Sequence, residues 1–328
     1  MTAAQVRLHL PGPMLDKGLA GLPRFFQRLL QELTACGAKT ALLRRDYDQL
    51  NGPQDAAHFD FVHNGRMQRA RALNLGVAYL GRFFYADPMG CYFESTINDM
   101  TFDPGSVDAG EAAKFVTYLR REWVDKRTSR HPQPEAREDF GQGHIAIFLQ
   151  DWSDPVERSR FVDSDTMVRT VVAQSAGRPV VVKPHPRYAG RETQKIRQFL
   201  RRNYPQVRVT EGNVHDILAG AAATVSISSS VALEGMLHRV PAILFGRSDL
   251  HHCVETVQRP EDWPAAFERA LAKDWPFEAF LHWFLRDQNI DASRPFLDRI
   301  LHRMAAQSAD FAALGITWPP DRLASEKA

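Results

Sequence analysis

Residues 180–187 read Val-Val-Val-Lys-Pro-His-Pro-Arg, and residues 226–230 read Ser-Ile-Ser-Ser-Ser. The first stretch is an apolar run that ends abruptly in cationic and imidazole side chains. The second is the end of another mostly apolar run, and its hydroxyls stand where a helix is expected to begin. In open parallel sheets, ligands bind beyond the carboxyl ends of the strands. Both stretches are therefore predicted to lie at one binding crevice.

Apolar runs alternate with helical patterns around these two stretches, which is typical of a parallel sheet covered on both faces. The expected strands of the second half are 145–149, 178–183, 207–209, 222–227 and 241–245. The first half opens with a strand–helix–strand pattern over 6–10, 24–36 and 39–43, followed by a strand at 58–63, a helical stretch at 66–73, a strand at 76–80 and a hairpin arm at 91–93. The fold class predicted is α/β with two Rossmann-like domains.

The polar stretch 126–143 is rich in Arg, Pro, Glu and Gly and is interpreted as the linker between the domains. We expect a first domain over 1–130, a second over 131–263, and a helical tail over 264–328 that packs on one or both domains. The tail is rich in aromatic residues, for which a place in the core is the expected role.

The composition is that of an ordinary globular protein, with 24% charged residues and a net charge of +2 in 328 residues. That balance gives no reason to expect nucleic acid as a partner. Three widely spaced cysteines provide no disulfide framework and no metal cluster, which favours a cytoplasmic location. No apolar run approaches the roughly 20 residues that span a bilayer, so any membrane contact is expected to be peripheral.

The first candidate group lies in the segment after the strand at 178–183. Pro184 and Pro186 flank His185 and restrict its backbone. His185 can donate to a phosphate, and Lys183 or Arg187 can add positive charge. The alternative is a proline turn that ends a strand and carries a surface histidine.

The second candidate group surrounds the expected start of a helix near residue 230. Ser228, Ser229 and Ser230 there, with exposed backbone N–H groups, would form a phosphate cradle, although helix capping alone explains one serine. Glu234 in the first turn either accepts from sugar hydroxyls or complements the helix dipole. Gly246, after the next strand, permits a tight turn or a close approach of a ligand.

The acidic candidates follow strands on the crevice side. Asp16 lies in the loop after the first strand, and Asp151 follows the first strand of the second half. Either carboxylate could act as a base, while a helix-capping role is the alternative for Asp151. His251, His252 and Cys253 are adjacent, but no matching second ligand pair is evident, so no metal site is predicted.

These residues resemble a known family, the capsule polysaccharide biosynthesis proteins, which are bacterial glycosyltransferases that use CMP-Kdo. The resemblance rests on Lys-Pro-His-Pro-Arg at 183–187, Ser-Ser-Ser-Val-Ala-Leu-Glu-Gly-Met-Leu at 228–237 and Val-Pro-Ala-Ile-Leu-Phe-Gly at 240–246. It extends more loosely over Phe-Val-His-Asn-Gly-Arg at 61–66, Tyr-Leu at 79–80 and Asp-Pro-Met-Gly-Cys-Tyr-Phe at 87–93, and so covers about residues 58–257.

The resemblance implies a GT-B fold with a cleft between an acceptor-side first domain and a donor-binding second domain. It implies that His185 and Ser228–Ser230 hold the phosphate of the donor and that Glu234 lies beside the nucleotide. The family has an acidic pair before its Tyr-Leu element, but residues 75–78 here are Leu-Gly-Val-Ala. The resemblance therefore assigns no catalytic carboxylate, and Asp87 and Glu94 join Asp16 and Asp151 as candidates.

The function predicted is transfer of a sugar from a nucleotide donor, such as CMP-Kdo, to a bacterial surface polysaccharide or glycolipid. The donor is a substrate, so no further cofactor is expected, and transfer without a metal ion is the expectation for this fold class. Two alternatives stay open. One is a transferase of polyol phosphate from CDP-glycerol, and the other is a catalytically silent protein that binds nucleotide or glycan.

Overall fold

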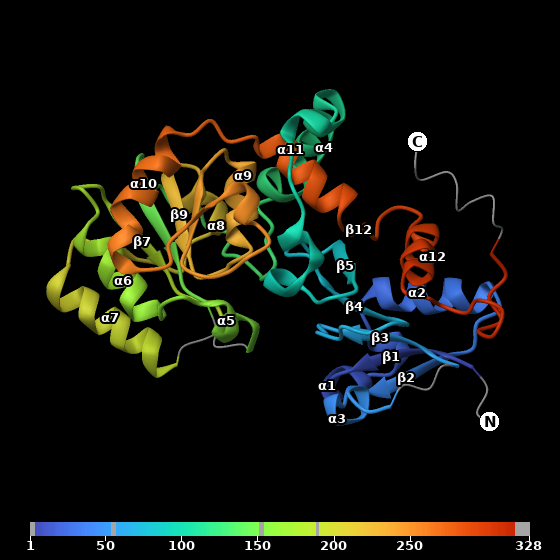
Figure 1. Ribbon diagram of the computed structural model, residues 1–328. Helices are drawn as coiled ribbons and strands as arrows, with labels where there is room; N and C mark the ends of the chain where they lie inside the picture. Colours follow the sequence, from blue (N-terminus) through green and yellow to red (C-terminus); the bar gives the residue numbers. More distant parts are fainter. Residues whose placement is uncertain (1–3, 54–56, 151–153, 188–189, 319–328) are drawn as a thin grey trace. The chain divides into compact units, whose positions relative to one another are not determined.

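The computed structural model describes residues 4–53, 57–150, 154–187 and 190–318. Contacts within the chain divide it into two compact units. The first unit contains Met1–Met100 together with Leu285–Ala328, and the second contains Thr101–Phe284. Figure 1 shows the elements of both units.

The first unit is built on a six-stranded sheet in the order β12-β5-β4-β3-β1-β2. The strands β2, β1, β3 and β4 are parallel, whereas β5 runs antiparallel to β4 and β12 antiparallel to β5. The strand bounds are Val6–Leu10 (β1), Thr40–Arg44 (β2), Phe59–His63 (β3), Ala72–Val77 (β4), Phe83–Asp87 (β5) and Ile290–Asp291 (β12). The helix bounds are Gly12–Leu15 (α1), Arg24–Ala35 (α2), Tyr47–Leu50 (α3) and Leu297–Ala306 (α12).

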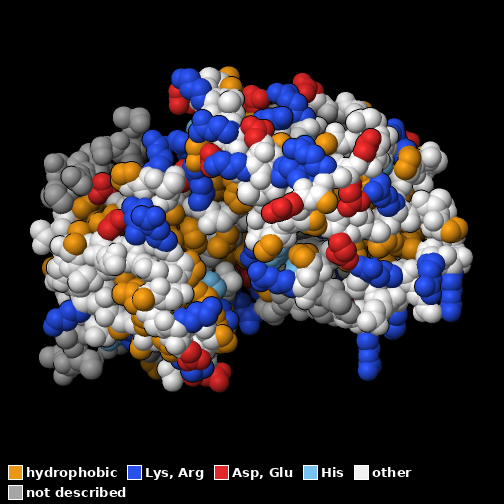
Figure 2. Space-filling view, turned by 180° about the vertical axis from the view of Figure 1, so that it is seen from behind, with side chains coloured by type: hydrophobic (Ala, Val, Ile, Leu, Met, Phe, Trp, Pro, Cys, Tyr) orange, Lys and Arg blue, Asp and Glu red, His pale blue; other side chains and the backbone are white. Residues whose placement is uncertain are grey.

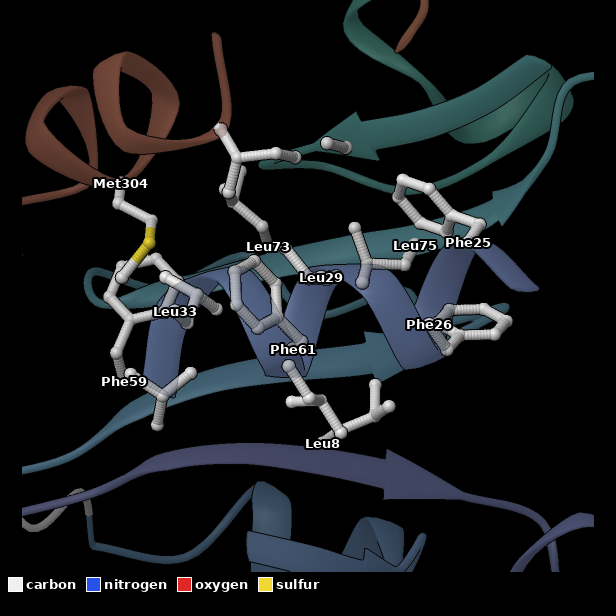
Figure 3. Close-up of a cluster of buried hydrophobic side chains, with 14 of the residues drawn as sticks. Leu8, Phe25, Phe26, Leu29, Leu33, Phe59, Phe61, Leu73, Leu75 and Met304 are labelled. Carbon is white, nitrogen blue, oxygen red and sulfur yellow. The ribbon is translucent and has the colours of Figure 1, made fainter. Parts of the chain in front are cut away.

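Two helices far apart in the sequence complete the core of this unit. Apolar residues recur on one face of α2, and that face packs on the sheet together with Met304 from α12 (Figure 3). The ring of Phe25 stacks on Phe84 of β5 with the ring centroids 4.0 Å apart. Gly37 follows α2 with φ 101°, and a Cβ there would lie 2.3 Å from the carbonyl oxygen of Gly315. Glycine thus ends the helix.

Part of the first half differs from the sequence prediction. The helical stretch predicted at 66–73 is wrong, because residues 66–69 are irregular and β4 already begins at Ala72. The buried amide of Asn74 explains this, since its Oδ1 accepts from the N–H of Met67 and its Nδ2 donates to the carbonyl oxygen of Met67. The hairpin arm predicted at 91–93 is also wrong, because Tyr92–Glu94 forms a short 3₁₀ helix.

The second unit holds an all-parallel sheet in the order β11-β10-β9-β6-β7-β8. The chain first moves outward from β6 through β7 to β8, and then returns to the other side of β6 with β9 and continues outward. The strand bounds are His144–Phe148 (β6), Val180–Lys183 (β7), Arg208–Val209 (β8), Ala221–Ser226 (β9), Ala242–Leu244 (β10) and Glu255–Thr256 (β11). This order is the doubly wound arrangement with a switch point between β6 and β9.

Helices cover both faces of this sheet (Figure 1). Ile145 and Ile147 of β6 face one core with α6, α7 and α10, whereas Ala146 and Phe148 face a second core with α8. That alternation is why the strand is apolar throughout. The helix bounds are Ala109–Arg120 (α4), Asp154–Ser159 (α5), Ser164–Ala173 (α6), Arg191–Asn203 (α7), Val214–Leu218 (α8), Val231–Leu237 (α9), Trp263–Ala272 (α10) and Phe277–His282 (α11).

The units divide the chain at other places than the sequence boundaries at 130 and 263. Helix α4 lies in the second unit, because it packs against α9 and α11 and the Arg120 guanidinium donates to the carbonyl oxygen of Leu237. The tail is shared, since α10 and α11 belong to the second unit and α12 to the first. Composition predicted a domain boundary in the polar stretch, at residue 130. Tertiary packing sets the boundary about thirty residues earlier, near residue 100.

The surface and the helices have two further properties. Among the described residues, no helix is both long enough and apolar enough to cross a membrane. On the face drawn in Figure 2, Lys and Arg side chains are interspersed with Asp and Glu side chains.

Candidate functional site

The candidate site lies at the carboxyl edge of the second unit's sheet. Because β6, β7, β9 and β10 are parallel, the segments that follow them emerge at the same edge. Gln150 follows β6, His185 follows β7, Ser228 follows β9 and Gly246 follows β10. The segments of His185 and Ser228 therefore flank the end of β6, at the switch point where doubly wound folds bind ligands.

The serine segment is a hydrogen-bonded loop. The N–H of Ser228 donates to Gln150 Oε1 over 2.7 Å, which ties the end of β9 to the end of β6. Ser159 donates its hydroxyl to the carbonyl oxygen of Val156, so the contact of 3.1 Å between Ser159 Oγ and Ser228 Oγ uses the hydrogen of Ser228. These hydrogen bonds within the protein therefore fix the conformation of the loop without a ligand.

The start of α9 also has internal partners. Ser229 Oγ accepts from the N–H of Val231, and the N–H of Ala232 donates to the carbonyl oxygen of Ser229. Ser230 directly precedes α9, but within the described chain its side chain makes no capping hydrogen bond. Of the three predicted serines, Ser230 thus keeps its hydroxyl available, whereas Ser228 and Ser229 hold the loop in shape.

His185 is half-buried and has a defined tautomer. Its Nδ1 accepts from the N–H of Arg187 over 3.3 Å, so the proton of the neutral ring sits on Nε2, which can only donate. The ring packs edge-on against His131 with centroids 5.1 Å apart. Arg187 itself is exposed. A histidine whose Nε2 is a donor fits an anionic ligand.

Lys183 has a structural role that the sequence did not reveal. Its side chain is buried, and Nζ donates to the carbonyl oxygens of Glu211 and Gly212 over 2.9 and 2.7 Å. Burial lowers the pKa of its ammonium group. The cation therefore fixes the loop after β8 and has one donor left.

Gly246 is a glycine for a packing reason. A Cβ at this buried position would lie 2.9 Å from the carbonyl oxygen of Ile227 and 3.1 Å from that of Ser159. The neighbouring N–H of Arg247 donates to the same Ser159 oxygen over 2.7 Å. The glycine thus lets the ends of β9, β10 and α5 approach one another, whereas the close approach predicted from the sequence was that of a ligand.

Glu234 lies in the interior, only 1% exposed, so its carboxyl does not face solvent. Its Oε1 accepts from Ser129 Oγ over 3.0 Å, and its Oε2 has no hydrogen-bond partner in the described chain. Burial raises the pKa of Glu234 to about 7, and the charge of Lys183 opposes this only in part.

Two histidines extend this buried cluster. His215 Nε2 lies 3.9 Å from Glu234 Oε2 and 2.7 Å from the carbonyl oxygen of Thr128, so its proton goes to Thr128. His215 Nδ1 lies 2.9 Å from His238 Nε2. Burial lowers the pKa of His215, and burial together with the charge of His215 lowers the pKa of His238 to about 4.

The buried cluster contacts the polar stretch 126–143 of the predicted linker. Residues 126–135 and Asn213 line a pocket of ≈ 530 Å³. Ser129 of this segment contacts Glu234, and His131 contacts His185. Sequence reasoning missed Ser129, His131, His215 and His238, because no local pattern distinguishes them and only tertiary contacts bring them to the site.

The acidic candidates occupy different surroundings. Asp16 is 69% exposed and lies 3.6 Å from Arg44 Nη2. Asp87 is buried, and each of its carboxylate oxygens accepts two hydrogen bonds. The donors are the N–H groups of Met89, Gly90 and Thr96 and the Thr96 hydroxyl. Asp87 therefore shapes a loop. Asp151 lies outside the described residues.

Among the residues with described positions, no group of three or more His, Cys, Asp or Glu side chains is placed to hold a metal ion. Cys253, beside His251 and His252, is buried, and burial raises the pKa of its thiol to about 12.

Comparisons with solved structures show the fold class. The chain matches the Thermosulfurimonas dismutans KpsC β-Kdo 2,4 transferase with a TM-score of 0.53 and 16% identity over 85% of this chain and 90% of that one. It matches the β-Kdo 2,7 transferase of the same KpsC with a TM-score of 0.54 and 12% identity over 92% and 99% of the two chains. The predicted α/β fold of GT-B type is therefore confirmed.

At these identities the likeness extends to the fold and not to the chemistry. No protein-family model matches the sequence. No curated protein matches it either. The function therefore has to be argued from the site.

Proposed function

We propose that this protein is a glycosyltransferase that moves a sugar from a nucleotide donor, most simply a CMP-sugar such as CMP-Kdo, to a bacterial surface polysaccharide or glycolipid. One observation carries the proposal. At the switch point of the second sheet, His185 has Nε2 as a donor on one side of β6, and the Ser228–Ser230 loop lies on the other side.

The chemistry that this arrangement supports is stabilisation of a leaving phosphate. Charge develops on the nucleotide as the glycosidic bond breaks, and preorganised donors at that point lower the barrier. We assign this role to His185 Nε2 and the Ser230 hydroxyl, with Arg187 adding positive charge from the exposed side. Asp16 and Asp151 are the proposed carboxylates for activating the acceptor.

The shared fold of the two Kdo transferases supports the donor class by analogy. We further propose that the protein acts in the cytoplasm at the inner face of the membrane. The protein groups that would meet the leaving phosphate make transfer without a metal ion the expectation, so EDTA should leave turnover unchanged.

The test combines binding with turnover. A thermal-shift screen against CMP, CDP, UDP and GDP should show stabilisation by CMP, because a ligand that binds only the folded state raises its stability. The His185→Ala variant should lower the turnover of CMP-Kdo by about a hundredfold, which is typical for loss of one donor to a developing charge. His302→Ala in the first unit is the matched control and should keep full activity.

Two outcomes would contradict the proposal. If His185→Ala turns over donor as well as the wild type, the assigned leaving-group role is wrong. If CDP-glycerol is consumed while no sugar is transferred from any nucleotide donor, the protein is a polyol-phosphate transferase instead.

A further inference from the structure

Helix α7 presents a basic face that the described chain leaves largely unneutralised. Its apolar side, with Thr193, Ile196 and Leu200, is buried in the core. The exposed side carries five cations, namely Arg191, Lys195, Arg197, Arg201 and Arg202, and the acid on this helix is the half-buried Glu192. Such an excess is unusual in a chain whose net charge is only +2.

Ion pairing accounts for one of these cations. Arg197 pairs with Glu211. Arg191, Lys195 and Arg201 form no salt bridge with the acids of the described chain, whereas Arg169 of the neighbouring α6 pairs with Asp165 over 2.7 Å. Four exposed positive charges therefore lack a salt bridge in the described chain, and three of them, Arg191, Lys195 and Arg201, share one side of α7.

The same side of α7 borders a groove of ≈ 800 Å³. The groove is also lined by Pro205, Val207 and Val209, the last of which lies in the edge strand β8. Gln198 adds an amide between the cationic side chains. The groove thus combines an aliphatic wall with donors that suit carboxylates and an amide that suits hydroxyls.

We propose that this groove holds an extended acidic glycan, a chain whose sugars carry carboxylates. The ten-residue separation of Arg191 and Arg201 corresponds to about 15 Å along the helix, which is the length of a short oligosaccharide. Helix α7 begins at the same edge of the sheet as His185, six residues further along the chain. The choice of a glycan as the polyanion rests on the proposed function, and the groove would hold the acceptor chain apart from the donor site.

An anionic membrane surface fits the groove less well. Helices that lie on membranes insert large apolar side chains into the bilayer. The exposed large apolar residues of the described chain are Leu19, Leu43, Met89, Met100, Phe161 and Leu271, and none of them lies between residues 191 and 209. The apolar residues of α7 face the protein core.

The test measures binding of a fluorescent oligogalacturonate, a linear glycan with a carboxylate on every ring, by fluorescence anisotropy. The Arg191→Gln/Lys195→Gln/Arg201→Gln variant should bind about tenfold more weakly, because exposed charge pairs contribute little individually but add across three sites. The control Lys17→Gln/Arg24→Gln/Lys39→Gln loses the same charge from exposed positions in the first unit and should bind like the wild type.

Three outcomes would overturn the proposal: unchanged binding by the α7 variant, equal binding of neutral dextran, or binding to phosphatidylglycerol vesicles without binding to the glycan. The thermal shift with CMP separates this proposal from the proposed function, because the α7 variant should keep that shift. If the wild type shows no shift with CMP while glycan binding still depends on α7, the groove stands and the donor assignment fails.

Discussion

Glu234 shows how a residue's role depends on what covers it. In the sequence it stands in the first turn of a helix, where an acid either meets a ligand or complements the helix dipole. In the structure Ser129 and His215 enclose it, and one carboxyl oxygen lacks a hydrogen-bond partner in the described chain. Burial without full pairing favours the protonated form, which is why its pKa rises to about 7.

This acid should make folding stability depend on pH. Its pKa is about 7 in the folded state against an ordinary value of 4.5 in the unfolded chain, so the folded protein binds the extra proton between these values. Stability should therefore fall as pH rises from 4.5 to 7 and level off above, by about 3 kcal/mol in total. Urea unfolding of the wild type and Glu234→Gln at pH 5 and pH 8 checks this.

The variant should lose this dependence, because glutamine stays neutral while its carbonyl oxygen still accepts from Ser129. The unfolding free energy of the variant, measured relative to that of the wild type, should therefore be higher at pH 8 than at pH 5. Glu268→Gln, on an exposed position of α10, is the matched control. An equal difference at both pH values would show that Glu234 does not carry the effect.

At the scale of a whole element, Asn74 shows that a buried side chain can decide the local structure. Its buried amide bonds the backbone of Met67 twice and also donates to the carbonyl oxygen of Asp87 over 3.0 Å. One side chain thereby holds the loop before β4 and the end of β5. A helical composition at 66–73 could not overcome this, because the amide satisfies the loop's backbone in a non-helical form.

Removal of this amide should be costly. Asn74→Ala leaves buried backbone groups of Met67 and Asp87 without partners, and we expect a loss of about 3 kcal/mol or more in unfolding free energy. Chemical denaturation measures it. Asn203→Ala removes an exposed amide that makes a single bond to the carbonyl oxygen of Phe199, and it should cost under about 0.5 kcal/mol. Similar costs for both variants would contradict the role assigned to Asn74.

The sequence predicted elements in both halves, with β1, α2, β2 and β3 within one residue, and the predictions that failed in the first half are those at 66–73 and 91–93. The strands at 145–149 and 178–183 appear as β6 and β7 within two residues, because they are apolar on both faces and alternate with amphipathic helices. The first half mixes parallel and antiparallel pairing and depends on side-chain bonds such as those of Asn74, which leave no periodic signal.

At the scale of the molecule, packing and not composition divides the chain. Helix α4 lies before the polar stretch, yet it joins the second unit through α9 and α11. The tail then passes from α11 to α12, which buries Ile300, Leu301 and Met304 in the core of the first unit. The first unit is therefore made from both ends of the chain.

This division predicts which fragment folds. Residues 101–284 should unfold cooperatively and keep the thermal shift with CMP. Residues 131–263 lack α4, α11 and most of α10, whose buried residues Phe115, Leu119, Phe267 and Phe280 belong to the unit's interior. That fragment should show no cooperative unfolding by circular dichroism. Equal folding of the two fragments would show that α4 and α11 are dispensable.

The sequence alone determined the α/β class, the positions of most strands along the second half, and the place of His185 and Ser228–Ser230 at strand ends. These follow from local periodicity, which a chain carries whatever it packs against. The tertiary structure decided the unit boundaries, the burial of Glu234, the commitment of Lys183 to a loop and the presence of Ser129 and His131 at the site. Those depend on contacts between distant residues, and hydrogen-bond partners far apart in the chain leave no trace in local sequence.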